Sequence, residues 1–216
     1  MIVLDLDGPI LDGRLRHHEC YRRILEAAGA TPLPLDRYWA LKRERVDRRR
    51  LLAESGAEAL YDGYLAAWLA TIETPELLAF DRVQPGALET LRAWKDAGVP
   101  LALVTARRAE DALQDQLSAL GLRPLFTVIV ATPFAETGEA KASAFAARLG
   151  DASSCRGWIG DTEIDVDAAR RLGVPSVAVT CGLRTAAYLQ SLGPAFLFDD
   201  LQAVRAADPL ALLPAQ

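Results

Sequence analysis

The feature that most constrains the fold is a regular alternation of short apolar runs and helix-like segments after Pro85 and Gly86. Each helix-like segment repeats its apolar residues at helical spacing and is closed by a glycine. Strands that alternate with helices in this way form a parallel sheet covered by helices on both faces. We expect strands at 100–104, 126–131, 157–159 and 176–179, and helices at 87–97, 109–120, 141–149 and 164–172.

The start of the chain adds one more strand. Residues 2–6 form an apolar run interrupted only by Asp5, and Gly8 and Pro9 follow it with turn chemistry. Residues 14 to about 80 show helical spacing and no convincing strand, with helices expected at 14–28, 35–53 and 58–72. We therefore predict an α/β protein: a Rossmann-like, doubly wound parallel sheet made of residues 1–13 and 81–216, with an inserted α-helical domain of residues 14–80.

Composition and charge narrow the class of protein. Hydrophobic residues make up 51% and charged residues 25%, which is typical of a soluble globular protein. The net charge of −5 gives no support to nucleic-acid binding, which usually shows a basic surplus. The three cysteines are too few and too scattered for a disulfide framework or a zinc site. No apolar run approaches the roughly 20 residues that cross a membrane and no signal peptide is visible, so we expect a cytoplasmic location and no membrane partner.

Polar side chains gather at the carboxyl ends of the expected strands, where ligands bind in open α/β sheets. Two like charges about 4 Å apart repel by about 4 kcal/mol at an effective dielectric constant near 20, so clustered carboxylates there favour a bound cation. Carboxylate and water ligands suit Mg²⁺, which usually also keeps phosphate oxygens of a substrate. Each residue alone could serve a turn or a helix cap, but their joint occurrence indicates a site. The residues are Asp5, Asp7, Thr105, Asp161 and Asp165, with Lys141 opening the helix before the 157–159 strand.

Six parts of the sequence share a family pattern: DLDGPILD at 5–12, LVTAR at 103–107, Lys141, GDTEID at 160–165, AARRLG at 168–173 and GLR at 182–184. Together they resemble the haloacid dehalogenase-like (HAD) hydrolase superfamily, in the group similar to phosphoglycolate phosphatase and β-phosphoglucomutase. The resemblance covers the whole expected core, and the helical block matches in position and type. It implies that this block is a cap domain that closes over the substrate and excludes water.

The resemblance also implies a magnesium-dependent phosphatase with residues in defined roles. Asp5 would be the nucleophile that forms an aspartyl-phosphate, and Asp7 the general acid that protonates the leaving group and then activates water. Lys141 would bridge the nucleophile and the phosphate. The phosphate would be bound by Asp5, Leu6, Asp7, Thr105, Ala106 and Lys141. Mg²⁺ would be bound by Asp5, the backbone carbonyl of Asp7 and Asp161, and Asp165 would be a further ligand or would act behind the direct ligands.

Two departures from the family pattern accompany these matches. Pro9 stands where relatives usually have Thr or Val, and it removes a backbone N–H beside the phosphate loop. Lys141 is followed by Ala-Ser-Ala, where the phosphoglycolate phosphatase group usually has a proline-rich continuation.

Candidates for substrate contact lie in or near the inserted domain. His17 and Asp12 align with positions near the hinge of relatives similar to β-phosphoglucomutase. Basic residues crowd between Lys42 and Arg50, where most are expected on a solvated face because they cannot all point one way on a helix. Lys42 or Arg45 could reach an anionic substrate from this cluster.

The leading hypothesis is the hydrolysis of a small phosphorylated metabolite by a monomer or homodimer, and two alternatives stay open. A phosphomutase similar to β-phosphoglucomutase would return the phosphoryl group to a sugar. A non-catalytic binding protein could keep the fold without the activity. Dehalogenases and phosphonatases fit less well, because they generally lack the second aspartate that Asp7 supplies here.

Overall fold

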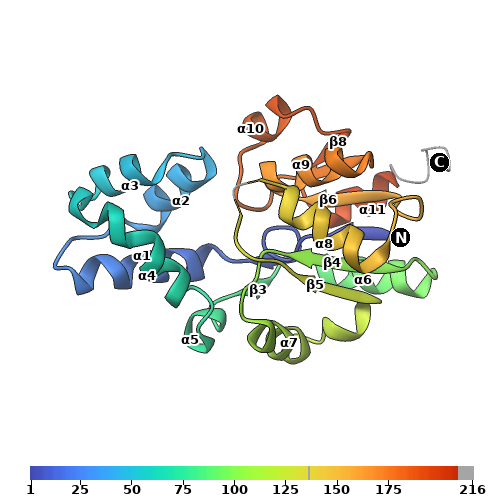
Figure 1. Cartoon of the computed structure of the whole chain (residues 1–216), viewed down its shortest axis with the longest axis horizontal. Coiled ribbons are helices and arrows are strands. Elements are labelled where there is room, and N and C mark those ends of the chain that lie inside the picture. The colour runs from blue at the N-terminus through green and yellow to red at the C-terminus, as the bar shows by residue number, and fades with distance from the viewer. Residues whose placement is uncertain (136, 209–216) are drawn as a thin grey trace. The chain divides into compact units, whose positions relative to one another are not determined.

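A computed structural model describes residues 1–135 and 137–208 of the chain (Figure 1). The chain divides into two compact units, one made of residues 1–12 and 83–216 and the other of residues 13–82. The larger unit contains both strands and helices, whereas the smaller unit is mostly helical. Two short strands, β2 (Leu11–Asp12) and β3 (Arg82–Val83), pair with each other in a separate two-stranded sheet.

The larger unit contains a six-stranded parallel sheet. Its strands are β1 (Ile2–Leu4), β4 (Leu101–Thr105), β5 (Val128–Ala131), β6 (Gly157–Gly160), β7 (Ser176–Val179) and β8 (Phe196–Phe198). Their order is β5-β4-β1-β6-β7-β8, and every neighbouring pair is parallel. The predicted α/β fold with a parallel sheet is confirmed, and β8 is a strand that the sequence did not lead us to expect. Because β1 pairs with β4 on one side and β6 on the other, the carboxyl ends of these three strands are neighbours.

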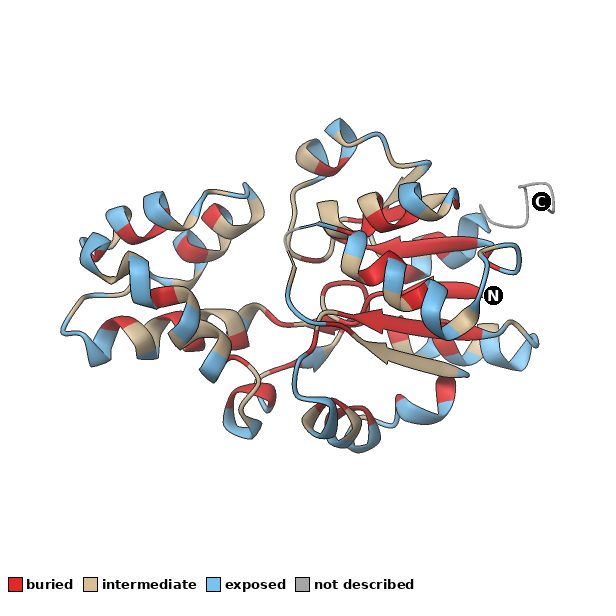
Figure 2. Ribbon diagram, in the orientation of Figure 1, coloured by how far each residue is buried: buried red, intermediate tan, exposed pale blue. Residues whose placement is uncertain are grey.

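Helices cover both faces of this sheet. They are α6 (Ala87–Asp96), α7 (Glu110–Ala119), α8 (Glu139–Leu149), α9 (Glu163–Leu172), α10 (Ala186–Ser191) and α11 (Leu201–Ala207), with a 3₁₀ turn η2 (Arg123–Leu125). Successive strand residues point to opposite faces, so Ile2 and Leu4 pack with α6, α7 and α11, whereas Val3 packs with α8 and α9. The central strands are buried along their length (Figure 2), which explains why they are apolar runs with no polar alternation.

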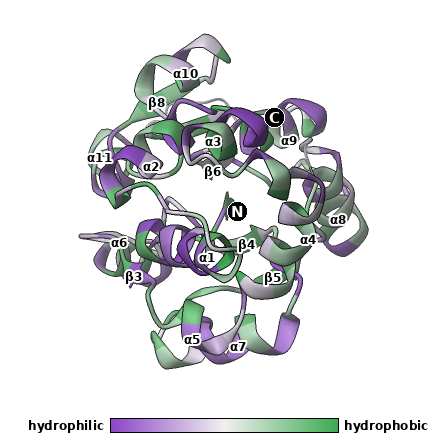
Figure 3. Cartoon of the chain, turned by 90° about the vertical axis from the view of Figure 1, so that its left-hand side faces the viewer, coloured by the Kyte–Doolittle hydropathy of each residue, from purple (hydrophilic) through white to green (hydrophobic). Residues whose placement is uncertain are grey.

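The smaller unit is a set of helices around its own apolar core. They are α1 (Arg14–Ala27), α2 (Leu35–Arg43), α3 (Arg48–Glu54), α4 (Tyr61–Thr71) and α5 (Pro75–Leu78), with a 3₁₀ turn η1 (Glu58–Leu60). Hydrophilic residues predominate along α1 (Figure 3), where Arg23 is exposed and the less numerous apolar side chains, such as Tyr21 and Leu25, are buried. The buried side chains of α1 meet those of α2, α3 and α4 in one cluster that includes Tyr38 and Leu52.

The single helix predicted over 35–53 is wrong, because the chain forms two helices there. Helix α2 ends at Arg43, and Arg45 then takes a left-handed conformation with φ of 57°, which interrupts helical hydrogen bonding. Asp47 starts α3 by accepting a hydrogen bond from the backbone N–H of Arg50 at 2.9 Å. An aspartate three residues before that N–H is a common helix start, so the sequence did contain a signal for this break.

A buried ion pair in the smaller unit gives a test of this packing. Arg16 Nε lies 2.8 Å from Asp81 Oδ1, and the two side chains are 2% and 0% exposed. Asp81→Leu should lower the free energy of unfolding by about 3–5 kcal/mol, because the guanidinium loses a buried counter-charge. The double variant Arg16→Met/Asp81→Leu should lose less, as measured by urea unfolding.

The matched control is the more exposed pair Arg37–Glu54, whose side chains are 51% and 24% exposed. Glu54→Ala should change stability by about 1 kcal/mol or less. An equal loss in Glu54→Ala and Asp81→Leu would contradict the role given to burial.

Candidate phosphate and metal site

Acidic residues from two neighbouring strand ends converge in the larger unit. Asp5 follows β1 directly, and Asp161 follows β6 directly. Carboxylate oxygens of Asp5, Asp161 and Asp165 all lie within 4.8 Å of one another, and the three residues are buried. Thr105 ends β4, the strand on the other side of β1. The structure therefore brings together residues that lie up to 160 positions apart in the sequence.

The two carboxylate oxygens of Asp161 have different surroundings. Its Oδ2 accepts a hydrogen bond from the backbone N–H of Leu183 at 2.5 Å. Its Oδ1 is buried and has no hydrogen-bond partner among the described residues. A buried anionic oxygen in this state is costly, so Oδ1 is suited to bind a cation.

Two glycines make room for the Asp161 carboxylate. A Cβ on Gly8 would lie 2.1 Å from Asp161 Cγ, and a Cβ on Gly182 would lie 2.0 Å from Asp161 Oδ2. Gly8 also has φ of +99°, which residues with a Cβ rarely adopt. The close approach of both backbones therefore explains why glycine stands at these two positions.

Asp165 differs from Asp161, because both of its oxygens are fully used by hydrogen bonds. Oδ1 accepts from Lys141 Nζ at 2.7 Å and from Trp158 Nε1 at 3.2 Å. Oδ2 accepts from Thr162 Oγ1 at 2.7 Å and from the Thr162 backbone N–H at 3.3 Å. A carboxylate offers about four lone-pair sites, and four donors occupy them here. The arrangement therefore suits Asp165 to orient Lys141 and the start of α9.

Lys141 connects Asp165 to the predicted nucleophile. Its side chain is 3% exposed, and Nζ lies 2.8 Å from Asp5 Oδ2 and 2.7 Å from Asp165 Oδ1. Lys141 is the third residue of α8, which begins at Glu139, so the prediction that it opens the helix was wrong by two residues. The second oxygen of Asp5, Oδ1, accepts from the backbone N–H of Leu6 at 2.8 Å. Both oxygens of Asp5 are thus fixed in orientation.

The crowding of charges shifts the ionisation of these groups. Burial raises the pKa of Asp5 to about 7; the ammonium of Lys141 opposes this shift, and the charges of Asp165 and Asp7 add to it. Burial also raises the pKa of Asp161 well above its usual value, with contributions from Asp165 and Asp5. Burial alone would lower the pKa of Lys141, but the two carboxylates outweigh it and raise that pKa. When all three carboxyls are ionised, the site therefore carries more negative charge than its single ammonium neutralises, and the raised pKa values reflect this repulsion and the burial.

Asp7 forms an ion pair that the sequence analysis did not anticipate. Arg107 donates from Nε to Asp7 Oδ2 and from a terminal nitrogen to Asp7 Oδ1, both at 2.7 Å. The Arg107 side chain is 2% exposed and that of Asp7 is 30% exposed. The segment 103–107 was part of the family resemblance, but Arg107 received no role. Its position directly after Thr105 and Ala106 at a strand end was the available signal.

The remaining predicted residues have the following surroundings. Thr105 is buried, and its Oγ1 has no hydrogen-bond partner among the described residues. Ala106 follows it and is half-buried. Pro9 lies in a turn that the N–H groups of Ile10 and Leu11 close, since both donate to the carbonyl of Leu6. The Thr105 hydroxyl is therefore the second buried oxygen in this region that is available to a ligand.

The residues predicted as candidates for substrate contact, His17, Lys42 and Arg45, lie in the smaller unit. The ring of His17 contacts those of Trp39 and Trp68 edge-on, at centroid distances of 5.9 Å and 5.3 Å. Lys42 Nζ lies 5.4 Å from the centroid of the Trp68 ring. Arg45 occupies the left-handed position between α2 and α3. Their predicted contact with substrate stays a prediction.

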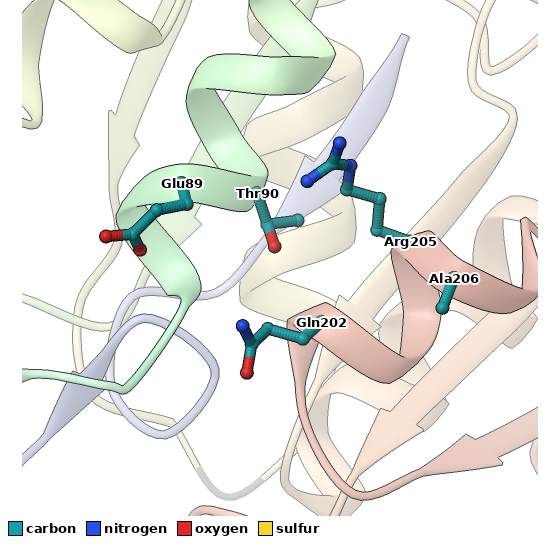
Figure 4. A pocket seen from close by; sticks show the side chains of 5 residues that line it. All are labelled: Glu89, Thr90, Gln202, Arg205 and Ala206. Carbon is teal, nitrogen blue, oxygen red and sulfur yellow. The ribbon is translucent and has the colours of Figure 1, made fainter.

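A pocket of 460 Å³ lies elsewhere in the larger unit, between α6 and α11 (Figure 4). Its lining residues contribute none of the predicted site residues, so it does not bear on the chemistry described above. The lining residues are Glu89, Thr90, Gln202, Arg205 and Ala206.

Every helix in the described part of the chain is too short or too polar to cross a membrane.

Comparison with known proteins decides the family. A family model described as haloacid dehalogenase-like hydrolase matches residues 1–173. The chain belongs to the HAD-like hydrolases. This hydrolase is 27% identical over 209 residues to a phosphoglycolate phosphatase of Rhodobacter capsulatus, with 94% of each chain covered. It is 31% identical over 194 residues to a phosphoglycolate phosphatase of Caulobacter vibrioides, with 84% of this chain and 79% of the relative covered.

A solved structure agrees with the fold of this HAD-like hydrolase. A haloacid dehalogenase-like hydrolase from Streptococcus pneumoniae superposes with a TM-score of 0.77 at 20% identity, covering 96% of this chain and 97% of that chain. At this identity the likeness concerns the fold. The comparisons as a whole confirm the family and the phosphatase class that the sequence motifs predicted.

The raised pKa of Asp161 predicts a pH-dependent stability of the metal-free hydrolase. A raised pKa in the folded state means that folding binds protons from about pH 4 upward, so this group costs stability as the pH rises. In EDTA, the melting temperature of Asp161→Asn should exceed that of the wild type by more at about pH 7.5 than at about pH 5. Mg²⁺ should raise the melting temperature of the wild type and leave Asp161→Asn unchanged.

The control for this measurement is Asp115→Asn, an exposed aspartate in α7. It should follow the wild type at both pH values and in Mg²⁺. A pH-independent difference between Asp161→Asn and wild type would show that the buried carboxylate does not titrate as described.

The packing of Gly182 predicts a second effect on the site. Gly182→Ala places a methyl group against Asp161 Oδ2, so the carboxylate must move. We expect Mg²⁺ affinity, measured by isothermal titration calorimetry, to fall by about 10-fold or more. Gly63→Ala, in α4 with nothing within 4 Å of the new Cβ, should bind Mg²⁺ as the wild type does. Equal affinities in both variants would contradict the tight fit around Asp161.

Proposed function

We propose that this HAD-like hydrolase is a magnesium-dependent phosphatase that acts through an aspartyl-phosphate on Asp5. The observation that supports this most is the setting of Asp5, with one oxygen on the ammonium of Lys141 and the carboxylate of Asp161 beside it. A nucleophilic carboxylate needs such fixed orientation to attack phosphorus in line. The Thr105 hydroxyl, at the next strand end, is available for a phosphate oxygen.

The reaction has two steps in this proposal. A carboxylate oxygen of Asp5 attacks phosphorus, the ester P–O bond breaks, and the leaving oxygen keeps the electron pair and takes a proton from Asp7. A water molecule then attacks the aspartyl-phosphate, gives its proton to Asp7, and displaces the Asp5 carboxylate. The products are an alcohol and inorganic phosphate, and both aspartates return to their starting forms.

The other site residues support these steps. Lys141 and Thr105 would hold the phosphate oxygens, together with the backbone N–H groups of Leu6 and Ala106. Arg107 stabilises the ionised form of Asp7, which suits its role as a base in the second step. As the acid of the first step, Asp7 must already hold a proton, which requires this ion pair to be loosened before the ester P–O bond breaks.

The chemistry of the donor set fits Mg²⁺. Asp5, the backbone carbonyl of Asp7 and Oδ1 of Asp161, which has no partner in the described part of the chain, would hold the ion. Hard oxygen donors of this kind are those that Mg²⁺ prefers. When bound, the ion would neutralise negative charge on the transferring phosphoryl group. Asp165 would act one layer further out, because its lone pairs are occupied by Lys141, Trp158 and Thr162.

The substrate proposed is a small phosphorylated metabolite. Relatives named phosphoglycolate phosphatase make 2-phosphoglycolate the first compound to test. The helical unit of residues 13–82 would serve as the cap that excludes water from the reaction. His17, Lys42 and Arg45 are its candidates for contact with the substrate.

Turnover in the presence of Mg²⁺ tests this function. The wild type should hydrolyse 2-phosphoglycolate or another member of a panel of phosphorylated metabolites, and EDTA should abolish the activity. Asp5→Asn should reduce hydrolysis to background, because it removes the nucleophile without changing its shape. Asp7→Asn should lower it by about 10²–10⁴-fold, the usual contribution of positioned acid–base catalysis.

The outcomes separate the alternatives. Equal activity in the wild type and Asp5→Asn would exclude this mechanism. Formation of an isomeric sugar phosphate in place of inorganic phosphate would identify a phosphomutase. No turnover of any compound, together with tight binding of one of them, would favour the non-catalytic binding protein.

A further inference from the structure

The loop after β7, residues 180–185, contacts the carboxylate of Asp161. The Leu183 N–H donates to Asp161 Oδ2, and the backbone of Gly182 packs against the same carboxylate. These contacts commit Oδ2 to the loop and leave Oδ1 without a protein partner among the described residues. The position of this loop therefore determines which carboxylate oxygen of Asp161 is available to a cation.

An ion pair ties this loop to the start of α9. Arg184 donates from Nε to Glu163 Oε2 at 2.7 Å and from a terminal nitrogen to Glu163 Oε1 at 2.9 Å. The two side chains are 11% and 15% exposed, so water screens the pair only weakly. Parallel contacts of this kind fix a guanidinium and a carboxylate in one relative orientation.

The positions of the two partners make this ion pair relevant to Asp161. Arg184 directly follows Leu183, and it also donates to the Leu183 carbonyl at 3.3 Å. Glu163 is the first residue of α9, two positions after Asp161. The pair thus links the peptide that binds Asp161 to the segment that carries Asp161.

The other side of the loop is also anchored. Thr185 caps α10 by accepting a hydrogen bond from the backbone N–H of Tyr188 at 3.3 Å. With Arg184 fixed to Glu163 and Thr185 fixed to α10, the Leu183 N–H has little freedom to move away from Asp161.

We propose that Arg184 and Glu163 are positioning residues for the divalent cation site at Asp161. Their ion pair holds the Leu183 N–H on Asp161 Oδ2 and thereby presents Oδ1 to the ion. This inference rests on the cation binding in the proposed function. Residues that orient a metal ligand without touching the metal typically change metal affinity by about 10–100-fold when they are replaced.

The experiment measures Mg²⁺ binding by isothermal titration calorimetry on the whole chain. Arg184→Ala and Glu163→Gln should each weaken Mg²⁺ binding by about 10–100-fold. The double variant Glu163→Gln/Arg184→Ala should bind Mg²⁺ no more weakly than the weaker-binding single variant, because both changes break the same ion pair. Arg184→Lys should recover part of the affinity, since an ammonium keeps the charge but lacks the two parallel donors.

The matched control is Arg171→Ala, which removes an ion pair with Asp167 on the same helix. That pair is 42% and 28% exposed and does not involve the loop after β7. Arg171→Ala should bind Mg²⁺ as the wild type does. Circular dichroism of the metal-free variants should match that of the wild type, so that a loss of affinity is not a loss of fold.

The possible results separate this inference from the proposed function. Absence of Mg²⁺ binding in the wild type, or equal binding in Asp161→Asn, would contradict the cation site itself. Binding in the wild type that is lost in Asp161→Asn but unchanged in Arg184→Ala and Glu163→Gln would overturn the positioning role alone. Additive losses in the double variant would also overturn it, because they would mean that the two residues act separately.

Discussion

The contact on which the site depends is that of one buried ammonium with two buried carboxylates. Lys141 lies between Asp5 and Asp165, and Asp161 adds a third carboxylate within the same few ångströms. Three negative charges against one positive charge leave a formal charge of −2 when all are ionised. Burial makes this surplus expensive, as the raised pKa values of Asp5 and Asp161 indicate. A divalent cation has the charge that balances the set.

The sheet topology makes this concentration of charge possible. Because β1 is central, the segments after β1, β4 and β6 meet at one edge although they come from distant parts of the sequence. Ligands bind at such a point in open α/β sheets because the connections leave the strands in opposite directions there. Helix α8 then supplies Lys141 from the face that it shares with α9. The apolar cores on both faces of the sheet thus fix the positions of the polar groups at its edge.

The features that could be predicted from the sequence are those with local signals. Apolar runs and glycine-terminated helices predicted β1, β4, β5, β6 and β7 of the parallel sheet, and the ends of these strands indicated Asp5, Thr105 and Asp161 as site residues. The break in the 35–53 segment was missed although Asp47 marks the start of a helix locally. There the helical spacing of apolar residues on both sides of Arg45 concealed the interruption.

The partners of these residues could not be predicted in the same way. Arg107 and Asp7 are 100 positions apart, and Arg184 and Glu163 are 21 apart, so no short pattern connects them. Which arginine meets which carboxylate depends on strand order and on loop conformation, and both are set by packing of the whole unit. A sequence motif thus identifies the acidic residues of a site more readily than the groups that orient them.

The difference between Asp161 and Asp165 shows what this orientation adds. The two residues are both aspartates, lie four positions apart in one motif and are almost equally buried. Their hydrogen bonds separate them, since four donors saturate Asp165 whereas Asp161 Oδ1 has none among the described residues. A cation needs an oxygen with lone pairs to spare, and an ammonium needs an acceptor that stays in place. The same side chain can therefore serve as a metal ligand at one position and as an anchor for Lys141 at the next turn, according to the donors that the fold brings to it.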